Sequence, residues 1–409
     1  MSAPEPDRRL APRPLPAHLA SAALVWQSSR AGLTSLSAGW PFSNRPSPAA
    51  ARLQVLAAEL ARHAPASLSA ALDRELGRRA DAFLRGIETY RDHPHRRPPT
   101  DGAVLWSEGS TRLLDFGGTG PAVLIVPSLI NRYHVLDLLP GHSFVGYLAG
   151  SGLRPLLVDW GAPGPAEAGF TLTDYIAGRL DAALDAAQAA TGRPVSVLGY
   201  CMGGLLALAL ALRRPAETGA LALLATPWDF HAERRDQSEL LAAAIEALPR
   251  ADGSMETLPV EIIQALFWTL DPFLAERKFV RFAGLDPDSA EARTFVALED
   301  WINDGVPLAW NVALECARGW YGDNDPPAGR WRIGGHAVKL EDLKSPVLLV
   351  LPRRDRIVPP RSAEALAHAL PDPTVLRPAF GHIGMMAAID APEMVWRPIA
   401  DWLQAHLGA

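Results

Sequence analysis

The chain has few cysteines, no excess of basic residues and no long apolar run. Each of these absences argues against one class of protein. Only two cysteines occur among 409 residues, Cys201 and Cys316, so no disulfide framework is expected. The net charge of -6 argues against a nucleic-acid-binding protein, which usually carries a basic surface. No run of about 18 apolar residues is present, so no membrane-spanning helix is predicted. Together these absences favour a reducing cytosol, where a free thiol can act as a nucleophile.

Motifs that bind metals and nucleotides are missing as well. No set of His, Cys and Asp residues has metal-ligand spacing, and no glycine-rich phosphate loop lies between a strand-like and a helix-like run. His93 and His95 stand two residues apart in a proline-rich stretch, where we expect solvated side chains rather than ligands. Glu5, Asp7 and several prolines occupy the first residues without an apolar run behind them, so no secretory signal is expected. The sequence therefore predicts no metal and no bound cofactor.

The most informative stretch is the turn from Gly199 to Gly204, which reads Gly-Tyr-Cys-Met-Gly-Gly. A short apolar run with β-branched residues precedes it, and a run of strong helix formers follows it. A strand, a glycine-flanked turn and a helix are typical of the nucleophile elbow of α/β-hydrolases, where the nucleophile's backbone is strained and the flanking chains pass closely. Cys201 is thus the candidate nucleophile. The alternative is a buried cysteine before an ordinary glycine-rich helix start.

The order of short strands and helices predicts an α/β class protein with an α/β-hydrolase fold. Strands alternate with helices over 102–230 and again over 339–409, which indicates a mainly parallel sheet covered on both faces. Between them, 231–338 reads as a helical cap inserted after the sixth strand. Its dense aromatic residues are expected to form the cap's own core, with an acyl-binding tunnel as the alternative. Residues 1–16 read as a disordered lead-in, and 17–101 as an N-terminal region of two or three helices.

Two further residues complete a candidate catalytic triad with Cys201. In α/β-hydrolases the acid and the histidine follow the nucleophile in chain order. Asp355 follows the strand-like run 347–351, and His382 follows the last strand-like run, so both are expected at the same edge of the sheet. Asp229, behind the preceding strand, is the alternative acid. A solvated turn for Asp355 and a core or helix-capping role for His382 are the structural alternatives.

These placements predict acyl transfer through a covalent intermediate. His382, oriented by Asp355, would take the proton of Cys201, whose thiolate would attack an acyl carbonyl. The backbone N–H groups of Met202 and Ile130 are the candidate oxyanion hole. Cys316 lies at helical spacing among apolar residues and is expected to be a core thiol.

The set of motifs resembles that of polyhydroxyalkanoate (poly-3-hydroxybutyrate) synthases over about residues 103–409. The matching segments are the G-x-C-x-G-G turn at Gly199–Gly204, the stretch Ile130–Leu138, the D-W-G turn Asp159–Gly161, the acid motif Asp355–Pro359 and the histidine motif Gly381–Ile383. The sequence departs from the family where Arg356 replaces a common histidine and Pro360 a common tryptophan. The region before the catalytic domain, about 100 residues long, also differs from both the large single-subunit and the short two-subunit synthases.

The resemblance implies Cys201 as nucleophile, Asp355 as acid and His382 as base. It implies a 3-hydroxyacyl-CoA substrate, a polyester chain that grows through a Cys-bound thioester with release of CoA, and a homodimer in the cytoplasm. The surface of polyester granules is a further candidate location, and the need for a partner subunit stays open. The departures leave a second hypothesis, a polyester-oligomer hydrolase or acyl thioesterase with the same triad. A non-enzymatic granule-associated protein is the third.

Overall fold

The structure, a computed structural model, describes residues 9, 12–37, 48–99, 102–248 and 256–406. The chain divides into two compact units, one made of Met1–His95 and Gln264–Glu299 and the other of Arg96–Ile263 and Asp300–Ala409. Residues 1–8 and 10–11 of the predicted lead-in lie outside the described residues. The predicted disorder is wrong at its end, because helix α1 already begins at Leu15.

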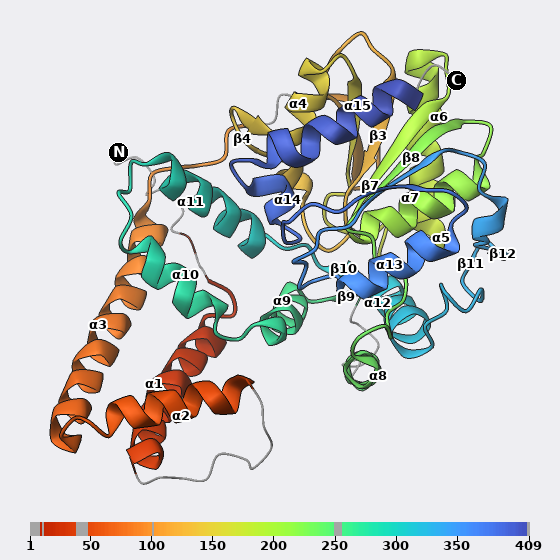
Figure 1. The fold of residues 1–409 in the computed structure, drawn as a ribbon. Helices are drawn as coiled ribbons and strands as arrows, with labels where there is room; N and C mark the ends of the chain where they lie inside the picture. The colour runs from red at the N-terminus through yellow and green to blue at the C-terminus, as the bar shows by residue number, and fades with distance from the viewer. Residues whose placement is uncertain (1–8, 10–11, 38–47, 100–101, 249–255, 407–409) are drawn as a thin grey trace. The chain divides into compact units, whose positions relative to one another are not determined.

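The second unit is built on an eight-stranded sheet (Figure 1). Five of its seven neighbouring pairs are parallel, and the two pairs that involve β2 are antiparallel. This topology confirms the predicted, mainly parallel sheet. In spatial order the strands are β1 (Ala103–Glu108), β2 (Thr111–Asp115), β6 (Arg154–Asp159), β3 (Ala122–Val126), β7 (Val195–Tyr200), β8 (Thr218–Leu224), β13 (Val347–Val350) and β14 (Thr374–Leu376).

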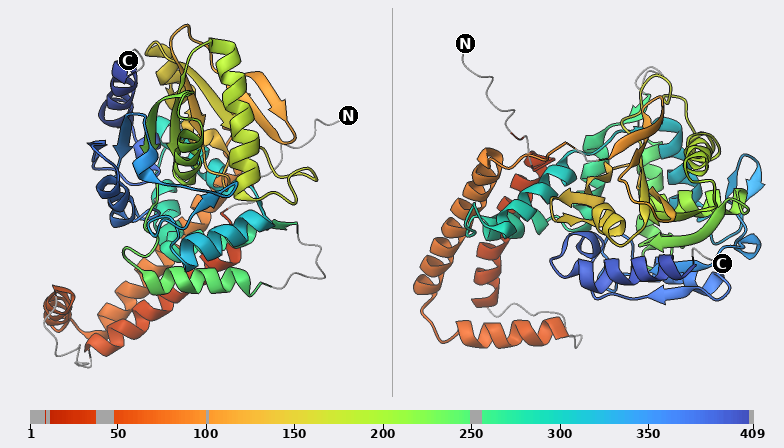
Figure 2. Two further views of the ribbon diagram at one scale, coloured as in Figure 1. Left: turned by 90° about the vertical axis from the view of Figure 1, so that its right-hand side faces the viewer. Right: turned by 90° about the horizontal axis from the view of Figure 1, so that it is seen from above.

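Helices cover both faces of this sheet (Figures 1 and 2). The helices α6 (Asp181–Thr191) and α7 (Met202–Arg213) lie on one face, and α4 (Phe144–Gly150) and α15 (Arg397–His406) lie on the other. All residues from Met202 to Ala211 are buried, as expected for a helix that is apolar on every side. On the other face, Trp396 packs against Phe144 and Tyr147 in the main hydrophobic core. Each fully buried side chain of this kind contributes about 1.5–3 kcal/mol.

Further short elements complete this unit. The helices are α5 (Leu172–Asp174), α8 (Arg235–Glu246), α12 (Trp310–Glu315), α13 (Pro360–Ala369) and α14 (Gly384–Ala387), with π-helical turns η2 (Tyr175–Leu180), η4 (Cys316–Gly322) and η6 (Pro392–Trp396) and 3-10 turns η1 (Tyr133–Leu136) and η5 (Leu340–Asp342). The three two-stranded sheets are β4 (Asp137–Leu139) with β5 (His142–Ser143), β9 (Thr257–Leu258) with β10 (Leu308–Ala309), and β11 (Arg332–Ile333) with β12 (His336–Ala337). Helices α9 (Val260–Leu270) and α11 (Ala290–Asn303) contain the points where the chain passes between the units.

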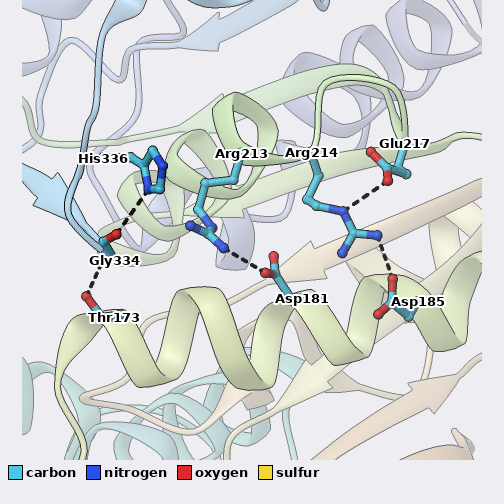
Figure 3. Close-up of polar contacts among 8 residues, drawn as sticks. All are labelled: Thr173, Asp181, Asp185, Arg213, Arg214, Glu217, Gly334 and His336. Carbon is cyan, nitrogen blue, oxygen red and sulfur yellow. Dashed lines mark hydrogen bonds and ion pairs between the residues drawn. The ribbon is translucent and has the colours of Figure 1, made fainter.

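Ion pairs fasten the far end of α7 to α6 (Figure 3). Arg213 contacts Asp181 at 3.0 Å, and Arg214 contacts both Asp185 at 2.6 Å and Glu217 at 3.1 Å. All of these groups lie at or near the surface, where such pairs contribute little energy individually. They link the C-terminal end of α7, whose first residue follows Cys201, to α6 and to the loop after α7.

The helical segment that leads to the nucleophile strand begins with a side-chain cap at Thr171. Thr171 accepts a hydrogen bond from the Asp174 backbone, and the Asp174 carboxylate accepts one from the Thr171 backbone, which makes a reciprocal capping box. The helical path then runs through η2 into α6 and ends at Gly192, whose φ of 66° is the left-handed conformation that favours glycine. On the neighbouring segment, Gly334 donates to the Thr173 hydroxyl at 3.0 Å and accepts from the His336 ring (Figure 3).

The first unit is helical. It contains α1 (Leu15–Ser37), α2 (Pro48–Leu60), α3 (Pro65–Asp92) and α10 (Leu274–Phe282). Phe83, Tyr90 and Phe279 form its core, with ring centroids 5.8–6.4 Å apart in edge-to-face contacts. Gly86 lets α3 approach α10, because a Cβ at this position would collide with the Phe279 carbonyl.

This division differs from the predicted segments at 264–299. The sequence pattern predicts that these residues belong to the cap. In the structure they pack with the N-terminal helices, because Phe279 and Phe282 are buried against α3. Phe279 and Phe282, which were predicted to belong to the cap, are therefore core residues of the helical unit, and Phe295 packs against them. The other predicted boundaries stay predictions.

His93 also differs from its expectation. It is buried rather than solvated, and its Nε2 donates to the Pro287 carbonyl at 2.9 Å while its Nδ1 accepts from the His95 backbone at 3.1 Å. The imidazole thus joins the His95 amide, in the loop where α3 ends, to the Pro287 carbonyl between α10 and α11. Spacing alone gave no sign of this burial.

Candidate active site

Cys201 occupies a strained turn between β7 and α7. Its backbone has φ 59° and ψ -128°, which is costly for a residue with a side chain and is tolerated when the surroundings enforce it. The Cys201 N–H donates to the Leu224 carbonyl at 2.8 Å, so β8 holds the turn in place. The residue is partly exposed at the point where the strand ends. This is the geometry that the glycine-rich motif predicts.

The glycines around Cys201 are required by close packing. A Cβ on Gly199 would collide with the backbone of Gly204, and one on Gly203 would collide with the carbonyls of Val126 and Pro127. The first turn of α7 therefore rests directly on the end of β3. Only glycine permits this approach, which is why the motif needs several of them in so short a stretch.

Asp355 and His382 meet although 27 residues separate them. Asp355 lies behind β13 and His382 in the loop between β14 and α14, and the His382 Nδ1 donates to Asp355 Oδ2 at 2.7 Å. The other carboxylate oxygen, Oδ1, accepts the backbone N–H groups of Ile357 and Val358 at 2.8 and 2.9 Å. Both side chains are buried. A carboxylate satisfied in this way fixes the imidazole tautomer and leaves the Nε2 of His382 for another partner.

The electrostatics of His382 indicate that this partner is the Cys201 sulfur. Burial alone would lower the pKa of His382, but the negative charge of the Cys201 thiolate, together with hydrogen bonds to Asp355 and Cys201, raises the pKa to about 10. The imidazole of His382 is therefore the base that adjoins Cys201. A cysteine beside an imidazole is the arrangement of an activated thiol nucleophile.

The two candidate oxyanion donors differ in their surroundings. Met202 is the first residue of α7, so its backbone N–H lies among the helix N–H groups that lack an intrahelical acceptor. The Ile130 N–H instead donates to the Ser128 hydroxyl at 3.3 Å, and the Ile130 carbonyl accepts from Val306. The structure thus places the Ile130 N–H in a local hydrogen bond. Its role, like the catalytic roles of the other predicted residues, stays a prediction.

Asp229, the alternative acid, is engaged in a different network. Its Oδ1 accepts the His231 backbone N–H at 2.9 Å and the Asn324 side chain at 2.8 Å. The Asn324 Oδ1 accepts from the Phe230 backbone, and the His231 ring donates to the Tyr321 carbonyl at 2.8 Å. Asp229 therefore ties the loop behind β8 to the end of η4, whereas Asp355 contacts His382.

Cys316 is the buried thiol that the sequence predicts. It lies in η4, and burial raises its pKa well above the ordinary thiol value. Both cysteines are free. Only Cys201 therefore combines access with a neighbouring imidazole.

Some cap aromatics line a cleft. Its volume is about 520 Å³, and its lining includes Thr171–Thr173, Glu315, Arg318–Trp320 and Arg330–Arg332. Trp320, in its wall, stacks on Phe230, and Phe230 contacts Tyr321 edge-to-face. Burial raises the pKa of Tyr321, and the charges of Cys316 and Cys201 raise it further.

Sequence reasoning missed Tyr200 among the site residues. Its hydroxyl donates to the His382 carbonyl at 3.1 Å inside the protein. The only signal for it was its position directly before the candidate nucleophile.

Metal sites and membrane-spanning helices were considered for the described part of the chain. No group of three or more His, Cys, Asp or Glu side chains there is arranged to hold a metal ion. Among the helices of the same residues, none combines the length and apolar character needed to cross a membrane.

Comparison with known proteins gives a family and two groups of relatives. Residues 121–388 match the family model of the alpha/beta hydrolase fold. The poly(3-hydroxyalkanoate) polymerase subunit PhaC of Allochromatium vinosum is 31% identical over 287 residues, which cover 69% of this chain and 80% of the relative. The corresponding subunit of a Synechocystis species is 31% identical over 291 residues, covering 69% and 77%. A monoacylglycerol lipase of Paleococcus ferrophilus aligns with a TM-score of 0.48 at 18% identity, over 72% of this chain and 99% of that one.

Proposed function

The chain belongs to the poly(3-hydroxyalkanoate) polymerase family within the α/β-hydrolase fold, and we propose that it polymerises 3-hydroxyacyl-CoA into polyester with release of CoA. The observation that carries this proposal is the buried hydrogen bond between His382 and Asp355, with the imidazole paired to Cys201 at the strained turn. An acyltransferase that works through a thioester needs this arrangement.

The first half of the reaction loads the acyl group. The Cys201 thiolate attacks the thioester carbonyl, and backbone N–H groups at the start of α7 stabilise the oxyanion. The intermediate collapses as the bond to the CoA sulfur breaks, and His382 gives its proton to that sulfur. CoA leaves as a thiol, and the acyl group stays on Cys201. One thioester replaces another, so this exchange has little free-energy cost.

The second half extends the chain. The hydroxyl group at the end of a polyester chain gives its proton to His382, and its oxygen attacks the acyl-Cys201 carbonyl. The Cys201 thiolate then leaves, and one new ester bond has formed. His382 is protonated again, so the thiolate–imidazolium pair is restored. Each step uses the side chains of Cys201 and His382, and the proposal includes no resident cofactor.

The alternative outcome replaces the chain hydroxyl by water, which would give an acyl thioesterase or a polyester-oligomer hydrolase. The triad is the same in both cases. The names of the relatives favour the polymerase, because both curated proteins reported above are polymerase subunits.

We also propose the setting in which the enzyme acts. A water-insoluble product makes the surface of a polyester granule in the cytoplasm the natural site of elongation. A homodimer, with or without a partner subunit, is part of the same proposal. Size-exclusion chromatography with light scattering tests the dimer, and sedimentation with polyester granules tests the location; a monomer that stays in the supernatant contradicts both.

The function itself is tested by release of CoA thiol from 3-hydroxybutyryl-CoA, followed by sizing of the product. The wild type is compared with C201A, and C316A is the matched control for loss of a cysteine. We expect release and insoluble polyester from the wild type and C316A, and neither from C201A. Free 3-hydroxybutyrate as sole product would establish the hydrolase instead. Absence of Cys201-dependent release, once a partner subunit has been supplied, would refute the acyl-CoA proposal.

A further inference from the structure

Tyr200 is held more firmly than an ordinary strand residue. It is the last residue of β7 and is 3% exposed. Gly199 before it packs on the Gly204 backbone, and Cys201 after it is fixed by its hydrogen bond to Leu224. Because neither neighbour can move without a collision or a lost bond, the side chain of Tyr200 leaves the backbone from a fixed point.

The loop that carries His382 is held by individual hydrogen bonds rather than by regular structure. It runs from the end of β14 at Leu376 to the start of α14 at Gly384, and its Pro378 and Phe380 carbonyls accept from the Arg353 and Arg354 backbone. Backbone hydrogen bonds use the carbonyls on either side of the histidine: Gly381 accepts from Met385, and Ile383 accepts from Met386. The carbonyl of His382 itself is bound by the Tyr200 hydroxyl at 3.1 Å.

The two side chains also touch. The ring centroids of Tyr200 and His382 lie 5.2 Å apart with an interplanar angle of 35°. Tyr200 therefore contacts His382 at the backbone through its hydroxyl and at the imidazole through its ring. Since Cys201 is the next residue along the chain, a single peptide links the nucleophile to the residue that holds its base.

We propose that Tyr200 is a positioning residue, whose hydroxyl locks the His382 backbone so that the imidazole spans Asp355 and Cys201. The proposal rests on the role given to His382 under the proposed function. Without the hydroxyl, the buried His382 carbonyl lacks its donor and the loop relaxes. The imidazole then moves away from the thiolate and the carboxylate, whose effects on it fall with distance.

The test uses Y200F, which removes one oxygen atom and keeps the ring contact. The matched control is Y175F, because Tyr175 is also 3% exposed and packs edge-to-face against Trp160 and Phe170. NMR titration of histidine-labelled full-length protein follows the imidazoles, and H382Q identifies the His382 signal among the 11 histidines. We expect the pKa of His382 to fall in Y200F and to stay at the wild-type value in Y175F.

Turnover supplies a second readout. With 3-hydroxybutyryl-CoA, Y200F should lower kcat about tenfold with little change in KM, because a displaced base affects the chemical steps rather than binding. An unchanged His382 titration in folded Y200F would refute the positioning role, even if the variant were less stable. If the wild type released no CoA but Y200F still shifted the titration, the positioning role would stand and the proposed function would fail.

A second variant covers the case in which Y200F does not fold. Replacement of Tyr200 by 4-aminophenylalanine keeps a weaker donor at the same place in the ring. We expect a smaller fall in the pKa of His382 than full loss of the donor would cause. A titration close to that of the wild type would support the proposal, because the donor is kept, and a His382 pKa at the ordinary histidine value despite the retained donor would overturn it.

Discussion

Asp229 and Asp355 occupy corresponding positions in the chain, since each follows a buried parallel strand by a few residues. Their side chains nevertheless bind different partners. Each carboxylate accepts one or more backbone N–H groups of its own loop, His231 for Asp229 and Ile357 and Val358 for Asp355. The difference lies in the remaining partner. Asp355 has His382 opposite it at 2.7 Å, and Asp229 has the Asn324 amide at 2.8 Å. A position just after a strand therefore makes an aspartate a candidate acid. The residue that a distant segment places against its carboxylate determines whether it serves as one.

Removing the charge at Asp355 should have the largest effect on catalysis. In D355N the amide can no longer stabilise the imidazolium of His382 or fix its tautomer. We expect CoA release to fall about 10³- to 10⁴-fold, as when the acid of a serine triad is neutralised. The rate from 3-hydroxybutyryl-CoA measures this effect. The matched variant D229N should change the rate less than about tenfold, since Asp229 contacts Asn324 rather than the base. Equal losses in the two variants would mean that the roles are assigned wrongly.

Removing the acceptor at Asp229 should act on stability instead. In D229A, the Asn324 amide and the His231 N–H lose the oxygen that they share. We expect the free energy of unfolding to fall by about 1–3 kcal/mol, because two partly buried hydrogen bonds to a carboxylate are lost. Urea unfolding followed by circular dichroism measures this change. A variant as stable as the wild type would show that the loop behind β8 does not depend on this network.

The pKa of His382 should also distinguish the role of Asp355 from that of Asp229. Its value of about 10 lies above the ordinary 6.5, so its protonation contributes stability that is fully present below pH 6.5 and is lost as pH rises through about 10. In D355N this loss should occur at lower pH, because the hydrogen bond and charge of Asp355 both raise the pKa. Unfolding free energies measured between pH 7 and 11 follow the effect. D229N should keep the wild-type profile; a shift of the same size there would contradict the separate roles.

The smallest expected effect is on the reactivity of the sulfur. Iodoacetamide should alkylate Cys201 at least about tenfold faster than Cys316, since burial raises the pKa of Cys316 and restricts access. In D355N the rate at Cys201 should fall a few-fold, because a less basic imidazole supports less thiolate. Mass spectrometry of timed digests reports both sites. Faster labelling of Cys316 would remove the basis for choosing Cys201.

The sequence alone determined the features that depend on neighbours along the chain. Alternating apolar runs and helix formers specified the parallel sheet, and the glycines from Gly199 to Gly204 specified the strained turn, because close packing there excludes every side chain. Their order in the chain after Cys201 then indicated Asp355 as the acid and His382 as the base of the triad. These signals are local, so they can be read without knowing what lies opposite.

Only the tertiary structure decided the features that depend on distant segments. Asp229 and Asp355 have the same local signal, and the position of His382 separates them. Tyr200 became relevant because its hydroxyl meets a carbonyl 182 residues further along the chain. Residues 264–299 packed with the N-terminal helices, and His93 was buried by a loop near Pro287. In each case the partner is brought in by folding, and no spacing within the segment encodes it.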